Sequence, residues 1–345
     1  MKNKIFLFLL LLTSFAQSQT GGLNAFPFLD LSYNARSAAL GRLYLTQIDK
    51  DVNLGVNNPA VFNEEMHNTI GFNQALLAAG INHGMISYAR HLDQWNVTGA
   101  AHLRYVAYGQ MDRTDVNGEV IGTFSAGDFI LGAGVGKELN ERMRIGANFN
   151  LIGSQLESFS SYGFSIDMAG TYTSKDEQTT MAMLVRNAGY QLTTYTTTDR
   201  SPLPANAIFS IAHKLEHAPF RLGVVVHHLN QWDLTYTDPT AQPTIDPLSG
   251  ELVPVPTAGF VEKLGRHFIF QTELFLGEAM RIRAAFDYQR RREFLVPNRP
   301  GMAGFSFGCG FNFKRFSLDY GLLIFSNAGY NNLITLTTNF DKWRK

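Results

Sequence analysis

Two adjacent histidines are the residues of this chain best suited to acid–base chemistry. His227 and His228 lie close to Asn230 and Asp233, and a histidine oriented by a carboxylate is the usual core of a hydrolytic site. The preceding residues alternate between apolar and polar, which predicts a strand whose successive side chains point to opposite faces. Alternation puts His227 on the inner face and His228 on the outer one, so the two cannot share a site. We therefore expect no enzyme here.

The other motifs that carry chemistry are missing from the sequence. There is no metal-binding motif, phosphate-binding loop or nucleophile elbow. Cys309 is the single cysteine, which excludes an internal disulfide and the cysteine-based metal frameworks. The formal net charge is zero, which argues against nucleic acid as a partner. We expect no cofactor.

A second group of residues with possible function consists of charges on the inner faces of predicted strands, together with one arginine near the N-terminus. These charges either line a pore or pair with one another and with the N-terminal segment, and pairing is favoured because it satisfies opposite charges in a confined space. The candidates are Arg36, Arg104, Arg144, Asp167, Glu273, Arg281, Arg283 and Asp287.

The segment 230–264 is the best candidate for a partner surface. It carries five prolines together with Trp232, Tyr236 and Phe260, and a stiff loop with exposed aromatics suits protein docking. A plain solvated loop is an equally good interpretation. A hairpin over 104–124, turning at Asn117-Gly118, is expected to project from the same rim.

The residues above lie on or between segments in which apolar and polar residues alternate. These segments predict fourteen strands after about residue 68. Nearly every charge on the regular strands lies opposite the aromatic side chains, as expected where a lipid-facing Lys or Arg costs about 2–4 kcal/mol. Charged residues make up only 17% of the chain and aromatics 12%. The predicted strands are 68–78, 83–91, 95–105, 125–137, 143–151, 162–173, 179–188, 205–215, 219–229, 268–276, 280–289, 305–313, 315–324 and 331–340.

The gaps between these strands predict an all-β fold, a 14-stranded antiparallel transmembrane β-barrel. Short and long gaps alternate, as in barrels with tight turns at one rim and long loops at the other. An even strand count puts both termini on one side, which we expect to be the periplasm, with the long loops outside the cell. A soluble β-sandwich is the alternative, but so much outward apolar surface would aggregate.

The residues before the first strand divide into two parts. Residues 1–16 carry a basic, an apolar and a small-residue part in order, as in a secretory signal peptide cleaved after Ala16 or, alternatively, after Ser18. Residues 17–67 do not alternate. A barrel of this size encloses more space than its own side chains fill, so we expect this segment to be a hatch or plug, with 68–345 forming the barrel. A flexible tail is the alternative.

Several stretches of the chain carry a resemblance to a known family. The stretch GGLNAFPFLDLSYNARSAALG is followed by DVNLGVNNPA, and YGQMDRTDVNGEVIGTFSAGD and Pro202-Leu203-Pro204 come later. Together they resemble the PorQ family of the type IX secretion system, within the fatty-acid-transporter-like outer-membrane barrel superfamily. The chain departs from the family pattern at Arg42, where many relatives carry glycine, and at Asp30-Leu31.

The resemblance implies a role as well as a fold. It implies a fourteen-stranded barrel with a hatch, embedded in outer-membrane lipids and anchoring a cell-surface attachment complex. In such complexes the barrel tethers a PorZ-like surface protein that handles lipopolysaccharide, alongside a PorU-like sortase and a PorV-like shuttle barrel. The wider superfamily implies the alternative, transport of hydrophobic small molecules across the outer membrane.

Overall fold

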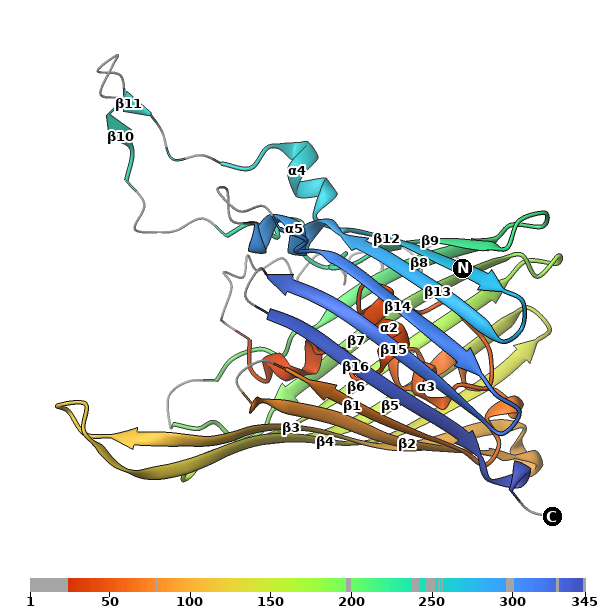
Figure 1. Cartoon of the computed structure of the whole chain (residues 1–345), viewed down its shortest axis with the longest axis horizontal. Helices are drawn as coiled ribbons and strands as arrows, with labels where there is room; N and C mark the ends of the chain where they lie inside the picture. Colours follow the sequence, from red (N-terminus) through yellow and green to blue (C-terminus); the bar gives the residue numbers. More distant parts are fainter. Residues whose placement is uncertain are drawn as a thin grey trace, which may run out of the picture.

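The chain forms a closed antiparallel barrel of fourteen strands (Figure 1). This computed structural model describes residues 24–77, 80–196, 200–236, 242–245, 252, 253, 255, 257–295, 301–326 and 329–343. The signal-peptide prediction lies outside them. The strands of the barrel are β1 Thr69–Leu76, β2 Asn82–Leu92, β3 Val97–Thr114, β4 Val120–Asn140, β5 Met143–Leu156, β6 Phe159–Thr173, β7 Thr179–Gln191, β8 Asn206–Lys214, β9 Phe220–Val226, β12 Phe268–Leu276, β13 Met280–Asp287, β14 Phe305–Asn312, β15 Phe316–Ser326 and β16 Gly329–Asn339.

Each strand pairs with its neighbours in sequence, and β1 pairs with β16 to close the ring. The predicted barrel is therefore confirmed, and its alternation is visible in the exposure of the side chains. Phe129, Leu131 and Phe149 are each about half exposed on the outer wall. Ile130, between the first two, and Asn150, next to Phe149, are buried inside. Lipid takes the place of water at such an outward apolar face.

The two ends of the barrel differ. At one end, which we call the turn end, strands are joined by short connections such as 141–142, 174–178, 215–219 and 277–279, and the C-terminal residues lie there too (Figure 1). The opposite loop end carries the long connections 192–205, 227–267 and 288–304. It also carries the β3–β4 hairpin, whose strands reach Thr114 and start again at Val120, beyond the rest of the wall. Which end faces the periplasm stays a prediction.

One strand ends earlier than the alternation predicts. We expected the eleventh strand to run through Gln289, but β13 ends at Asp287 and the helix α5, Tyr288–Phe294, follows directly. The cause is local, because the Asp287 carboxylate accepts a hydrogen bond from the backbone N–H of Arg290 at 3.1 Å. Such an N-cap starts a helix and ends the strand.

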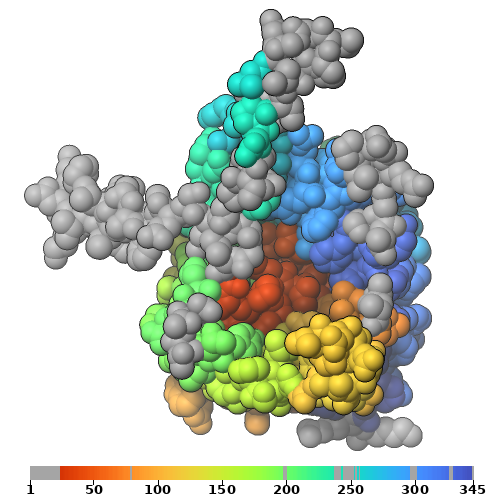
Figure 2. Space-filling model, turned by 90° about the vertical axis from the view of Figure 1, so that its left-hand side faces the viewer, coloured from red at the N-terminus to blue at the C-terminus, as the bar shows by residue number. Residues whose placement is uncertain are grey.

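The N-terminal segment lies inside the barrel as short helical pieces. Figure 2 looks into the loop end and shows this segment in red within the ring. The pieces of this segment, which we call the hatch, are η2 Pro27–Asp30, α2 Ala35–Ala39, α3 Val52–Asn57, η3 Pro59–Val61 and η4 Glu64–Met66. An asparagine or aspartate caps each of the pieces α2 to η4 by accepting a hydrogen bond from a backbone N–H two or three residues further along the chain, which explains the Asn58-Pro59-Ala60 sequence.

Glycines in the wall let the hatch backbone approach closely. A side chain at Gly321 of β15 would overlap the carbonyl oxygen of Ala35 in α2, and one at Gly308 of β14 would overlap Ala39. Apolar contacts fill the space nearer the loop end. There Phe26, Phe28 and Leu29 form one buried cluster with two further hatch residues, one loop residue and four inward residues of the wall. The hatch residues are Tyr33 and Val56, the loop residue is Leu203, and the wall residues are Met85, Val106, Ile130 and Ile152.

Two further observations concern the described residues. None of their helices has both the length and the apolar character that crossing a membrane requires. None of their histidine, cysteine, aspartate and glutamate side chains gather in threes in a way that would hold a metal ion.

Candidate functional site in the barrel lumen

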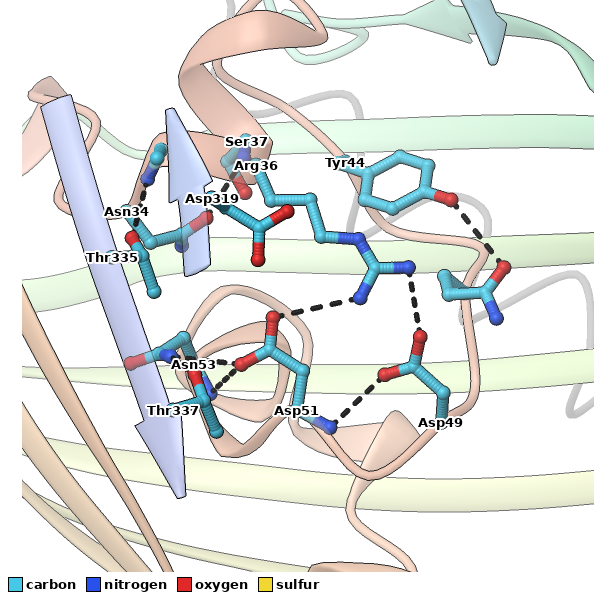
Figure 3. Close-up of polar contacts among 12 residues, drawn as sticks. Asn34, Arg36, Ser37, Tyr44, Asp49, Asp51, Asn53, Asp319, Thr335 and Thr337 are labelled. Atoms are coloured by element: carbon cyan, nitrogen blue, oxygen red, sulfur yellow. Dashed lines mark hydrogen bonds and ion pairs between the residues drawn. The ribbon is translucent and has the colours of Figure 1, made fainter. Parts of the chain in front are cut away.

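The hatch arginine Arg36 is the centre of a buried charge cluster (Figure 3). Its guanidinium lies 2.7 Å from Asp49 and 3.5 Å from Asp51, both in the hatch segment between α2 and α3. Burial alone would raise the pKa of the Asp49 carboxyl, but Arg36 holds that pKa well below its usual range. Asp51 also accepts a hydrogen bond from the side chain of Asn53, which in turn donates to Thr337 of β16. The cluster thus joins the hatch to the wall.

A second chain of charges runs along the wall beside this cluster. Arg283 of β13 lies 2.9 Å from Glu273 of β12 and 2.5 Å from Asp319 of β15, and it is only 2% exposed. Glu273 also pairs with Arg221 of β9 at 3.1 Å and accepts a hydrogen bond from Tyr44 of the hatch at 3.0 Å. The predicted residues Glu273 and Arg283 therefore do pair with each other.

Two predicted residues of opposite charge, Arg104 and Asp167, are connected indirectly. Arg104 donates to the side-chain oxygen of Asn150 at 2.9 Å, and the amide nitrogen of Asn150 donates to Asp167 at 3.1 Å. Arg104 also lies 5.5 Å from the centre of the Tyr33 ring. All of these groups are buried, so the asparagine side chain carries the polar contact that an ion pair would otherwise make.

Arg42 has a φ angle of +80°, in the left-handed region that glycine adopts most readily. Here the guanidinium of Arg42 lies 3.2 Å from Asp287, which also lies 3.7 Å from Arg290 of α5. The predicted lumen residue Asp287 thus pairs with the hatch at the point where β13 becomes α5.

The last two predicted charges lie at the turn end. Arg281 lies 3.7 Å from Asp49 of the hatch. Arg144 pairs with Glu138 of the neighbouring strand β4 and makes no ion pair with the described residues of the hatch. The eight predicted residues thus belong to separate groups along the lumen and do not form one site. The residues that contact these charges but were not predicted as candidates are Asp49, Asp51, Tyr44, Asn150, Arg221 and Asp319. Of these, Asp319 and Asn150 lie on the polar faces of predicted strands.

The interpretation of the two histidines was wrong in one respect. His227 and His228 lie side by side, with their Nδ1 atoms 2.6 Å apart. The reason is that His228 has a φ angle of +54°, so the chain turns there and the strand alternation no longer applies. The carboxylate of Asp233 interacts with Lys263 at 2.6 Å and with Thr235, so it does not orient either ring.

This histidine pair predicts a pH dependence at the loop end. Burial lowers the pKa of His228 to about 4, and burial followed by the charge of His228 lowers the pKa of His227. Arg42, His267 and, for His227, Arg290 lower these pKa values further, whereas Asp30 and Asp287 oppose the shift for His228. Between pH 6.5 and 4 these histidines therefore bind protons in the unfolded chain but stay neutral in the folded one. The free energy of unfolding falls as the pH falls through this range.

We expect amide exchange in residues 227–236 to accelerate as the pH is lowered from about 6.5 to 4, after correction for intrinsic rates. Replacing His228 with glutamine should reduce that acceleration, because two protonated rings no longer meet. His217, in a turn at the other end, provides the control substitution. Equal acceleration in the His228→Gln variant would contradict this origin.

The aromatic residues proposed for partner binding form the base of the long loop. Trp232 packs against Phe260 at 5.4 Å between ring centres and against His267 at 5.7 Å. Phe260 begins the short helix α4, Phe260–Gly265, and the loop also contains β10, Thr244–Ile245, and β11, Leu252–Val253. Trp232, Tyr236 and Phe260 all keep half or more of their surface exposed.

Comparison with known proteins identifies the fold. No protein-family model matches the chain, and no curated protein does. Among solved structures, the toluene transporter TbuX of Ralstonia pickettii is similar over 90% of this chain and 99% of its own, with 10% identity and a TM-score of 0.53. The toluene transporter TodX of Pseudomonas putida matches over the same shares, with 14% identity and a TM-score of 0.52. At these identities the likeness establishes the fold alone.

The chain is therefore a closed barrel with the fold seen in those two proteins. The match extends over nearly the full length of both, so the hatch and the barrel are compared together. The names of the two proteins describe what those proteins transport.

Proposed function

We propose that this chain is a closed outer-membrane barrel that anchors a cell-surface complex, as the resemblance to the PorQ family of the type IX secretion system implies. The observation that supports this proposal best is the filled lumen. Phe26, Phe28 and Leu29 occupy the apolar part, and the ion pairs of Arg36 and Arg283 occupy the polar part. A barrel filled by its own chain is suited to holding a partner at its rim.

The loop end supplies a surface for such a partner. Asp233 pairs with Lys263 at 2.6 Å, and Glu262 pairs with Arg266 and Arg292, each at 3.0 Å, so the base of the loop is braced. Phe260 and Val261 of α4 are 68% and 80% exposed. A braced base with exposed apolar side chains is typical of protein docking sites. We propose that a PorZ-like surface protein binds here, in a complex with sortase-like and shuttle-like components.

Trimming the loop tests this proposal. We expect a soluble surface protein to co-purify with the barrel after gentle detergent extraction, and replacing 235–260 with a short Gly-Ser linker to abolish that capture, because it removes Tyr236 and Phe260. An equal exchange of the turn 174–178 at the other end is the control. If capture survives trimming, this loop is not the anchor; if no surface protein is captured by the intact barrel, the scaffold proposal fails.

A second candidate is transport of hydrophobic small molecules, and the comparisons favour it over the scaffold. TbuX and TodX, the two similar structures described above, are toluene transporters. A groove of about 300 Å³ also lies on the outer wall over β1, β2, β3 and β16, where a hydrophobic ligand could rest; it is lined by Phe72, Asn73, Gln74, Ile86, Tyr105, Ile334 and Leu336.

The wall beside this groove gives less support for transport. The β2–β3 ladder is paired without a register shift from Asn82 to Leu92, so no lateral gap interrupts it. Uptake of toluene into liposomes that contain the purified barrel distinguishes the two candidates. Uptake above the rate of protein-free liposomes supports transport, and an equal rate rejects it.

A further inference from the structure

A cavity of about 260 Å³ lies at the turn end between the hatch and strands β13 to β16. It is separate from the apolar cluster near the loop end, and it adjoins the ion pairs of Arg36 and Arg283. Both the hatch and the wall contribute basic side chains to its lining, namely Arg36, Lys50, Arg281, Arg283, Arg315 and Lys342. Four carboxylates line it as well, those of Asp49, Asp51, Glu65 and Asp319.

The carboxylates do not balance these cations. Arg36 engages Asp49 and Asp51, and Arg283 engages Asp319. Within the described residues, no carboxylate lies within ion-pair distance of Lys50, Arg315 or Lys342. Arg315 instead stacks over the Trp343 ring at 5.0 Å. The cavity therefore holds a local excess of positive charge although the whole chain is neutral.

Two of these cations line the cavity from the two sides of the junction between hatch and wall. Lys50 lies in the hatch, and Lys342 ends the short helix η7, Phe340–Lys342, that follows the last strand. Burial lowers the pKa of Lys342, and the charge of Lys50 lowers it further. Like charges that line one cavity repel each other, and an anion bound between them would offset that repulsion.

A buried donor in the lining points to the same chemistry. Arg36 is 3% exposed, and its Nε has no hydrogen-bond partner among the described residues. A buried guanidinium nitrogen without an acceptor is costly, and a ligand oxygen would satisfy it. Hydroxyl and amide groups of Ser317, Thr338 and Asn312 line the same space.

We propose that this cavity binds a phosphate group, either as free phosphate or as a small phosphate ester, between Lys50, Lys342 and Arg315. Guanidinium and ammonium groups are the common ligands of phosphate, and a dianion matches several unpaired cations better than one carboxylate does. The bound anion would link the hatch to the last strands of the wall.

Calorimetric titration of the detergent-purified full chain with inorganic phosphate tests the proposal. We expect saturable binding to the wild type, and a loss of about tenfold or more in affinity when Lys50→Gln and Lys342→Gln are combined, because both charge-assisted contacts disappear. The matched control combines Lys175→Gln and Lys214→Gln, which remove the same charge at the same end without touching the cavity. That control should bind phosphate as the wild type does.

A second titration with dihexanoyl phosphatidic acid separates a lipid source from a free one. Tighter binding of this short lipid than of phosphate indicates a lipid headgroup, and equal or weaker binding indicates a free solute. The proposal is overturned if phosphate binding does not saturate, or if both double variants lose the same affinity, since the effect would then be general rim electrostatics.

Discussion

Replacing Arg283 with methionine is expected to destabilise the barrel by about 3–5 kcal/mol, the usual cost of removing one partner from a buried ion pair. Arg283 lies between Glu273 and Asp319, and all three side chains are less than 10% exposed. Without the guanidinium, two carboxylates stay buried with a shortage of positive charge. Methionine has a similar length and fills the volume, so the loss reports the charge and not a cavity.

Equilibrium unfolding of the barrel in guanidinium chloride, reconstituted in lipid, measures this loss. Arg144→Met is the matched control, because Arg144 pairs with Glu138 where both side chains are partly exposed, and such pairs contribute about 1 kcal/mol at most. Adding Glu273→Gln and Asp319→Asn to Arg283→Met should recover much of the stability. A single variant as stable as the wild type would mean that water, and not Arg283, solvates these carboxylates.

The barrel could be predicted from the sequence because strand alternation is a local property. A residue such as Leu131 is outward because of its position between Ile130 and Gly132, and no distant contact changes that. The residues at which strands end were harder to predict from the sequence. The Asp287 cap turns the end of β13 into a helix, and the positive φ of His228 brings two rings together that alternation separates. Both effects depend on a single backbone position.

Among the contacts in the lumen, only those between two strands of the wall could be predicted from the sequence. Glu273 and Arg283 stand on polar faces of adjacent strands, so their pairing follows from register. The hatch has no such period, and its contacts reach very far along the chain: Tyr44 meets Glu273, and Asn53 meets Thr337. Nothing in the local sequence of Asp49 indicates that Arg36 will lie beside it. Those pairings depend on how the hatch folds inside the finished ring.

Replacing Gly321 with valine is expected to open the barrel to ions. Gly321 faces the lumen, and its missing side chain makes room for the carbonyl of Ala35. The backbone N–H of Ala35 donates a hydrogen bond of 2.8 Å to the Thr335 hydroxyl of β16, which holds Ala35 in place. A branched side chain at this point cannot be accommodated by a rotamer change, because the obstacle is backbone. The hatch must move away, at a cost of about 1–3 kcal/mol for overpacking.

Conductance in planar bilayers measures this opening. The wild type should give no steady channel, because the hatch fills the lumen, whereas Gly321→Val should give one and should also expose hatch residues to added protease. Gly99→Val is the matched control: Gly99 is also a strand glycine, but it faces outward and the nearest atoms to an added Cβ lie 4.0 Å away. Valine suits that lipid-facing wall, so the control should stay closed. A closed Gly321→Val barrel would show that the hatch shifts without leaving the lumen. An open wild type would show that the hatch does not seal the ring, and the scaffold proposal would lose its main support.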